Sequence, residues 1–138
     1  MDRERLLRRA LRVAAVFNLG GALLFAFPAS PLGVIAGLPS DVPLPYRALT
    51  AEFVLLFGGA YAWLAAQETI DRPFVAFGAI GKASAFSVVL LLWLVGEAAA
   101  RSVALISGDL LFAALFAWCL FGAPAAVRTD PAAARSRR

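Results

Sequence analysis

Four strongly polar side chains lie within otherwise apolar stretches of the sequence: Asn18, Glu52, Lys82 and Asp109. A charged side chain in mid-bilayer costs about 2.5–3.5 kcal/mol on the insertion scale, so three unpaired charges would cost roughly 8–10 kcal/mol. This cost favours pairing, neutralisation or access to water. We therefore predict that the three charged groups form one cluster, with Asn18 beneath it and Tyr61 nearby. Such a cluster suits proton or ion handling, or capture of a ligand headgroup.

Lys82 carries particular weight because it is the only lysine in a chain with twelve arginines. Burial shifts the protonation of an ammonium group readily, whereas a guanidinium stays charged. Two roles remain open for the predicted cluster. It either orients the helices without further function, or it is a functional site.

The residue types that are absent exclude several chemistries. The chain has no histidine and one cysteine, Cys119. Imidazole ligation of haem or metals, Ser-His-Asp hydrolysis and an intramolecular disulfide are therefore excluded within this chain. No nucleophile–base pair is visible, so we predict no catalytic residue, no metal site and no cofactor from the residues themselves.

The composition indicates that the elements holding these groups are transmembrane helices. Of the 138 residues, 62% are hydrophobic and 16% are charged, against roughly 45–50% and about 25% in soluble domains. Four apolar stretches have the length of a membrane-spanning helix, and none alternates with the period of a strand. We predict an all-α integral membrane protein whose single domain, 10–122, is a four-helix bundle with helices over about 10–27, 47–66, 74–95 and 103–121.

Small residues recur at four-residue spacing along these helices, as is typical of packed membrane helices. Asn18 lies in such a series between Ala14 and Ala22, and Asp109 lies four residues before Ala113. Both polar side chains are therefore predicted to face the interior of the bundle.

The first stretch also fits the basic and apolar regions of a signal peptide. However, Phe27-Pro28-Ala29 is a poor cleavage site, and Asn18 interrupts the apolar core. We expect this stretch to be a retained helix.

The charges predict the orientation. With the N-terminus inside, ten basic residues lie on the cytoplasmic side and only Arg47 and Arg101 lie outside. We therefore predict a multi-pass membrane protein with both termini cytoplasmic. The basic N-tail (1–9) and the disordered basic C-tail (123–138) flank the bundle and contact lipid headgroups. Neither tail has the aromatic residues of a nucleic-acid interface, so no nucleic acid is expected as a partner.

The predicted outer loop, 28–46, is apolar and rich in proline. It contains the segment LGVIAGL, which is too short to span a bilayer. Two readings remain open: a connector that rests on the lipid, or a lid over the bundle mouth.

Four segments carry a resemblance to a known group of proteins: FNLGGALLFAFP, AEFVLLFGGAYAWLA, GAIGKASAF and SGDLLFAALFAW. In size, span number and glycine-rich helices the chain resembles small four-helix bacterial inner-membrane proteins, DoxX-like in outline. Some of these are linked to quinone or sulfur metabolism and act beside redox partners. The resemblance therefore implies a quinone as the one conceivable cofactor.

Two classes of function follow. The first is an accessory protein, a subunit or stabiliser of a membrane complex, with the lipid bilayer and a larger membrane protein or further copies of itself as partners. The alternative is a small transporter or a lipid- or quinone-binding protein that uses Lys82 as an anchor. Catalysis ranks third, because only proton transfer at Lys82 is conceivable.

Overall fold

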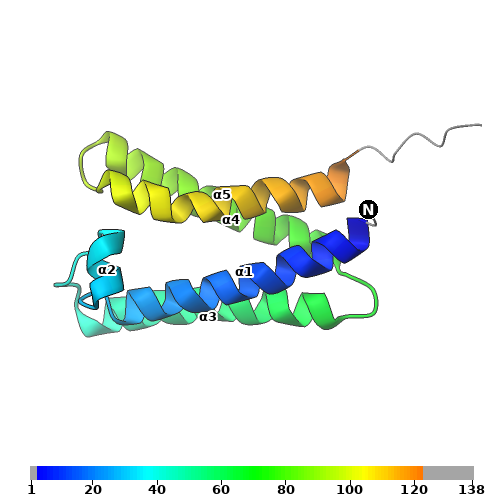
Figure 1. Ribbon diagram of the computed structural model, residues 1–138, viewed down its shortest axis with the longest axis horizontal. Coiled ribbons are helices and arrows are strands. Elements are labelled where there is room, and N and C mark those ends of the chain that lie inside the picture. Colours follow the sequence, from blue (N-terminus) through cyan, green and yellow to red (C-terminus); the bar gives the residue numbers. More distant parts are fainter. Residues whose placement is uncertain (1–2, 123–138) are drawn as a thin grey trace, which may run out of the picture.

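The computed structural model describes residues 3–122, which form five helices and no strand (Figure 1). The helices are α1 (Arg3–Ala26), α2 (Pro31–Ala36), α3 (Leu44–Ala66), α4 (Arg72–Leu94) and α5 (Ala100–Phe121). All except α2 are long and apolar enough to cross a membrane. The expectation of an all-helical protein with four potential spans is confirmed. The predicted C-tail, 123–138, lies outside the described residues.

Helix α1 begins seven residues earlier than the sequence analysis expected. Residues 3–9, assigned there to a basic tail, form its first turns. The apolar spacing explains the extension, because Leu7 is buried one turn before Leu11 on the same side of the helix. Arg8 and Glu4 add an ion pair at four-residue spacing. The other three spans begin two or three residues before their predicted starts.

The segment between α1 and α3, predicted as the outer loop, contains the short helix α2, and its own residues set the two ends of that helix. The Ser30 side chain caps the first turn by accepting a hydrogen bond from the Gly33 amide, and Pro31 occupies the first helical position. Gly37 ends the helix at a φ of 79°, a conformation that favours glycine. The Ser102 hydroxyl at the start of α5 donates to the Ala36 carbonyl over 3.3 Å. The loop is therefore a structured element tied to α5.

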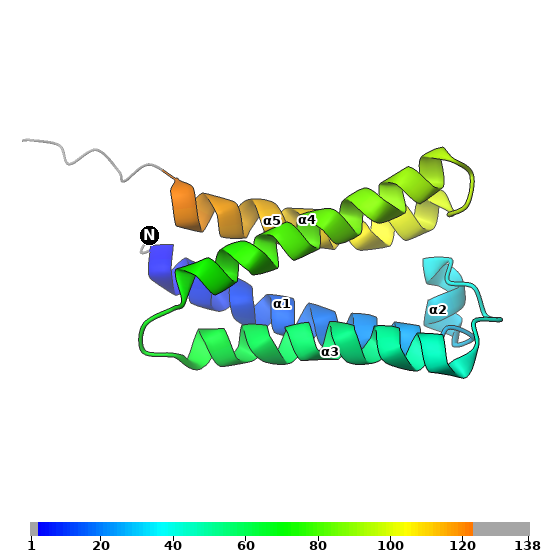
Figure 2. The same cartoon turned by 180° about the vertical axis from the view of Figure 1, so that it is seen from behind.

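The four long helices form two antiparallel pairs, α1 with α3 and α4 with α5 (Figures 1 and 2). The pairs meet mainly through α1 and α5. The start of α1 and the end of α5 lie at one end of the bundle, and α2 lies at the other.

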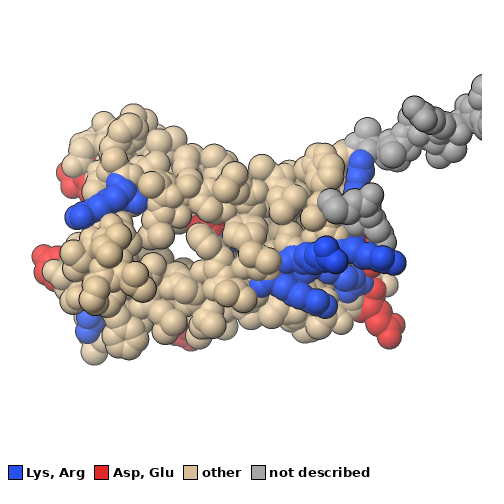
Figure 3. Space-filling view, in the orientation of Figure 1, with Lys and Arg blue, Asp and Glu red and all other residues tan. Residues whose placement is uncertain are grey.

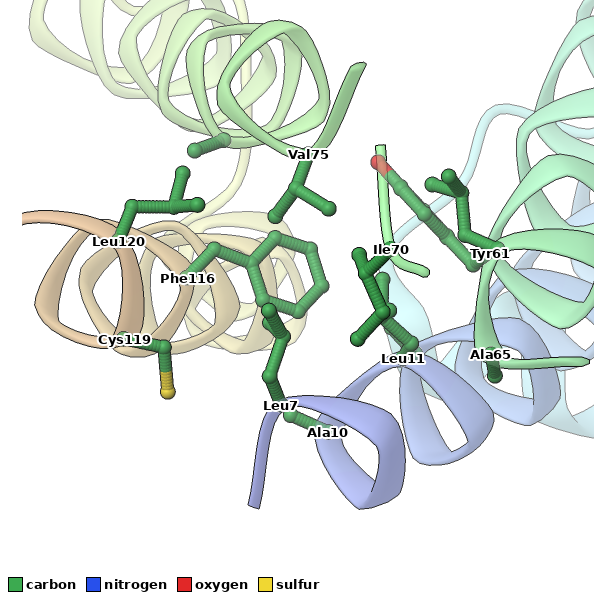
Figure 4. Packing of buried hydrophobic residues seen from close by; sticks show 13 residues of the cluster. Leu7, Ala10, Leu11, Tyr61, Ala65, Ile70, Val75, Phe116, Cys119 and Leu120 are labelled. Carbon is green, nitrogen blue, oxygen red and sulfur yellow. The ribbon is translucent and has the colours of Figure 1, made fainter. Parts of the chain in front are cut away.

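The apolar core occupies the end of the bundle that carries the start of α1. Figure 4 shows side chains from all four long helices converging there, with Phe116 between Val75 and Leu7. Phe116 and Val75 are completely buried, and Cys119 packs in the same cluster. No comparable apolar cluster of buried side chains fills the opposite half of residues 3–122. The packing is therefore asymmetric along the bundle axis.

Arginines tie the helix ends together at this same end, where Figure 3 shows basic side chains gathered. Arg8 donates to the Gln67 carbonyl and, over 2.6 Å, to the Glu68 carbonyl just past α3. Arg72 donates to the Leu120 carbonyl, and Arg3 to the Gly122 carbonyl, at the end of α5. These bonds satisfy carbonyl groups that lack partners within a helix and place positive charge at its negative end.

The close contact of α1 with α3 leads to a stability prediction. A Cβ atom on Gly58 would lie 3.1 Å from the Asn18 Cβ and 3.3 Å from the Ala15 carbonyl oxygen. Gly58→Leu should therefore push α1 away from α3 and lower the free energy of unfolding by about 1–3 kcal/mol. Titration of the purified protein in detergent with sodium dodecyl sulfate, followed by circular dichroism, measures the change.

Gly20→Leu is the matched control, because Gly20 is exposed on α1 and its added Cβ would meet nothing within 4 Å. It should change the free energy of unfolding by less than about 0.5 kcal/mol. Equal losses from the two substitutions would contradict the packing described.

Candidate functional site

Lys82 of α4 and Asp109 of α5 form a buried ion pair between the two helices of one pair. The Lys82 side chain is 4% exposed and the Asp109 side chain 12%. Lys82 lies about 18 Å along α4 from its last residue, Leu94, and so near the middle of the span. Pairing makes the cluster neutral overall and offsets part of the cost of placing the two charges in lipid.

Asn18 extends this ion pair into a hydrogen-bonded chain that crosses all four long helices. Its Oδ1 accepts a bond of 2.9 Å from the Lys82 ammonium group. Its Nδ2 donates over 3.1 Å to the Val54 carbonyl of α3. The chain of contacts runs from α5 through α4 and α1 to α3, and the bond between Asn18 and Lys82 joins the two helix pairs.

Three aromatic rings surround the Lys82 ammonium group. Its Nζ lies 5.3 Å from the ring centroids of Phe17 and Tyr61 and 5.2 Å from that of Phe112. Cations are attracted to the faces of such rings, with roughly 2 kcal/mol or more when water is excluded. Lys82 has three N–H groups, and within residues 3–122 only two have oxygen acceptors, so the rings supply the rest of its surroundings.

Close helix contacts hold these rings in place. The hydroxyl of Tyr61 donates over 3.4 Å to the Gly78 carbonyl of α4. Phe17 lies against Gly108 of α5, where an added Cβ would come within 2.7 Å of the ring. The phenylalanines were missed in the sequence analysis. The available signal was spacing, because Phe17 precedes Asn18 and Phe112 follows Asp109 by three residues, about one helical turn.

The structure brings four of the five predicted site residues together: Asn18, Tyr61, Lys82 and Asp109. Glu52 is not among them, and its predicted pairing with Lys82 is corrected. Its side chain is exposed on α3, and it makes no ion pair with any residue between 3 and 122. Nine residues, about two and a half helical turns, separate Glu52 from the buried Tyr61, so the two side chains lie on opposite sides of α3.

The Lys82 cluster consists of Asn18, Tyr61, Lys82 and Asp109 with the rings of Phe17 and Phe112. Two hollows in the structure lie away from this cluster. One, of about 260 Å³, lies at the basic end beside Arg3, Glu68 and Cys119. The other, of about 270 Å³, is an apolar groove between α3 and α4. Within the described residues, no three His, Cys, Asp or Glu side chains meet as metal ligands would. The Lys82 cluster itself is occupied by its own side chains, and its evident physical effect is to join helices.

No protein-family model, curated protein or solved structure matches the chain. The DoxX-like resemblance therefore stays a prediction that rests on the four sequence segments alone.

The ion pair leads to a mutational prediction. Lys82→Ala leaves Asp109 buried without a counterion and should lower the free energy of unfolding by about 3–5 kcal/mol. Adding Asp109→Asn removes the stranded charge and should restore part of this loss. Unfolding of the single and double variants in detergent, compared as a double-mutant cycle, gives the coupling between the two residues.

Glu52→Gln is the control for this cycle. Because Glu52 makes no contact with Lys82, the substitution should add to Lys82→Ala without coupling, within about 0.5 kcal/mol. Strong coupling between Glu52 and Lys82 would contradict this and support the predicted cluster of three charged groups. Lys82→Arg tests the choice of cation. A guanidinium is larger than the ammonium group that the three rings surround, so we expect lower stability than wild type. Wild-type stability in that variant would show that lysine is not specifically required.

Proposed function

We propose that the protein is an integral membrane accessory protein, a subunit or stabiliser of a membrane complex. The observation that carries the proposal is that side chains of the protein itself surround Lys82 and balance its charge. Lys82 is bonded to Asp109 and Asn18 and enclosed by aromatic rings. A cation so occupied serves to hold the bundle together, which leaves the outer surface of the helices as the part that meets partners.

The outward surface is large enough for that role. In the most apolar stretch of each span, only 22–28% of the residues are buried within the bundle. Large exposed side chains include Leu111 and Ile80, at 71% and 68%. In a membrane, such surfaces are covered by lipid or by the helices of another protein.

The proposed location is the bacterial inner membrane, with both termini in the cytoplasm. The support is the concentration of basic side chains at the end of the bundle that holds the start of α1 (Figure 3). The outer side would then carry α2, whose exposed Leu32 and Ile35 suit the lipid headgroup region.

Native mass spectrometry of the tagged protein, extracted gently from its own membranes, tests the proposal. We expect a complex in which this chain is present in fixed ratio with a larger membrane protein. A monomer without a partner, across several mild detergents and lipid nanodiscs, would contradict the accessory function.

A second candidate function is binding of a lipid- or quinone-type ligand with Lys82 as anchor. It is favoured by the openings that Figure 3 shows between the two helix pairs, in the half of the molecule nearer α2. In this case native mass spectrometry should give a small-molecule adduct. The variant Lys82→Met with Asp109→Leu replaces the ion pair by apolar groups, so it should stay folded and lose the adduct.

The orientation is a separate prediction. Green fluorescent protein fused to the C-terminus should fluoresce, and alkaline phosphatase fused there should be inactive, because each enzyme or fluorophore matures on one side of the membrane. Fusions inside the α4–α5 connection (96–99) should give the reverse pattern. An active C-terminal phosphatase would place that end outside and contradict the charge-based assignment.

A further inference from the structure

Glu52 is a carboxylate on the outward side of a span. It is exposed, and none of the ion pairs or side-chain hydrogen bonds within residues 3–122 involves it. It lies eight residues from the start of α3, about 12 Å along the helix axis. A glutamate side chain is too short to reach the interface from this depth. Lipid tails offer no counterion, so a basic side chain from another molecule would stabilise the carboxylate at this position.

An apolar groove lies directly beside Glu52. It has a volume of about 270 Å³ and is bounded by α3 and α4, with Phe53, Leu56, Phe57, Ala60, Phe74 and Phe77 as its lining. Leu56 follows Glu52 by about one helical turn, so the carboxylate stands at the edge of the groove. The groove has room for a bulky apolar side chain of a neighbouring helix.

Gly59 makes this surface accessible to another backbone. It follows Glu52 by seven residues, about two turns, and so lies on the same side of α3. It is exposed, and an added Cβ would meet nothing within 4 Å. An unobstructed glycine lets a second membrane helix approach closely, which strengthens packing and polar contacts between helices.

We propose that the Glu52 face, made of Glu52, Gly59 and the groove, binds a transmembrane helix of a different membrane protein. That helix carries a lysine or arginine opposite Glu52 and inserts an apolar side chain into the groove. The inference rests on the proposed accessory function and names its surface and the chemistry of its partner.

A second copy of the chain does not supply the required charge. Lys82 is buried and already paired with Asp109. Arg47 lies five residues nearer the start of α3, about 7.5 Å along the axis, and on a different side of the helix from Glu52. In a parallel dimer formed through this face, Glu52 would therefore meet no basic side chain at its own depth.

Photocrosslinking in native membranes tests the inference with the full-length protein. A benzophenone amino acid replaces Leu56, which lines the groove and is 60% exposed, or Leu111 of α5, which is 71% exposed and serves as the control site. After irradiation, the crosslinked peptides are sequenced by mass spectrometry.

We expect the probe at 56, and not the probe at 111, to join one different membrane protein through a transmembrane peptide that contains a lysine or arginine. Glu52→Leu and Gly59→Leu should each lower the yield at least about tenfold. Gly20→Leu, an exposed glycine on α1, should leave it unchanged. Glu52→Lys should abolish the crosslink, and the reverse charge change in the partner should restore it.

Glu52→Leu replaces a lipid-facing charge by an apolar group, so it should remain folded, which thermal unfolding in detergent verifies. Crosslinks to a second copy, or to lipid alone, would overturn the inference. If native mass spectrometry finds a partner but only the probe at 111 captures it, the accessory function is supported and the proposal that the Glu52 face binds the partner is wrong. If no partner is found by either method, the accessory function itself fails.

Discussion

The bundle depends on one chain of polar contacts between its helices, because the surrounding lipid offers no hydrogen-bond partners. Asp109 pairs with Lys82, Lys82 bonds to Asn18, and Asn18 bonds to a backbone carbonyl of α3. Hydrophobic association contributes little between helices that are already in lipid, so close packing and interhelical hydrogen bonds must align them. Each of the four long helices contributes to this chain of contacts, and the bond of Asn18 to Lys82 links one helix pair to the other.

The packing of the bundle differs on the two sides of the bond between Asn18 and Lys82. Toward the start of α1, buried side chains from all four long helices pack around Phe116, and Arg3, Arg8 and Arg72 bond to the ends of neighbouring helices. Toward α2, Figure 3 shows the pairs standing apart, and α2 with its contact to Ser102 connects them. The bond between Asn18 and Lys82 therefore lies between a half that holds the buried apolar core and a half, toward α2, in which the pairs stand apart.

The sequence was sufficient to predict the four spans and the pairing of Lys82 with Asp109. Both follow from the cost of exposing backbone or charge to lipid, a cost that composition and depth determine. Glu52 was misassigned because depth alone does not decide which side of a helix a residue occupies. The rings of Phe17 and Phe112 were missed because phenylalanine is common in all four spans. The arginine contacts with helix ends depend on which helices are neighbours, and no local pattern reports that.

The order of these contacts along the chain has a consequence for biogenesis. Asp109, the Leu120 carbonyl and the Gly122 carbonyl all belong to the last helix or its end, whereas their partners Lys82, Arg72 and Arg3 lie in earlier segments. Until α5 inserts, Lys82 is a cation in lipid without its counterion. Synthesis of α5 and of Gly122 just after it therefore supplies these partners of Lys82, Arg72 and Arg3 among residues 3–122. A chain truncated before α5 would leave Lys82 without Asp109 and Arg72 without the Leu120 carbonyl.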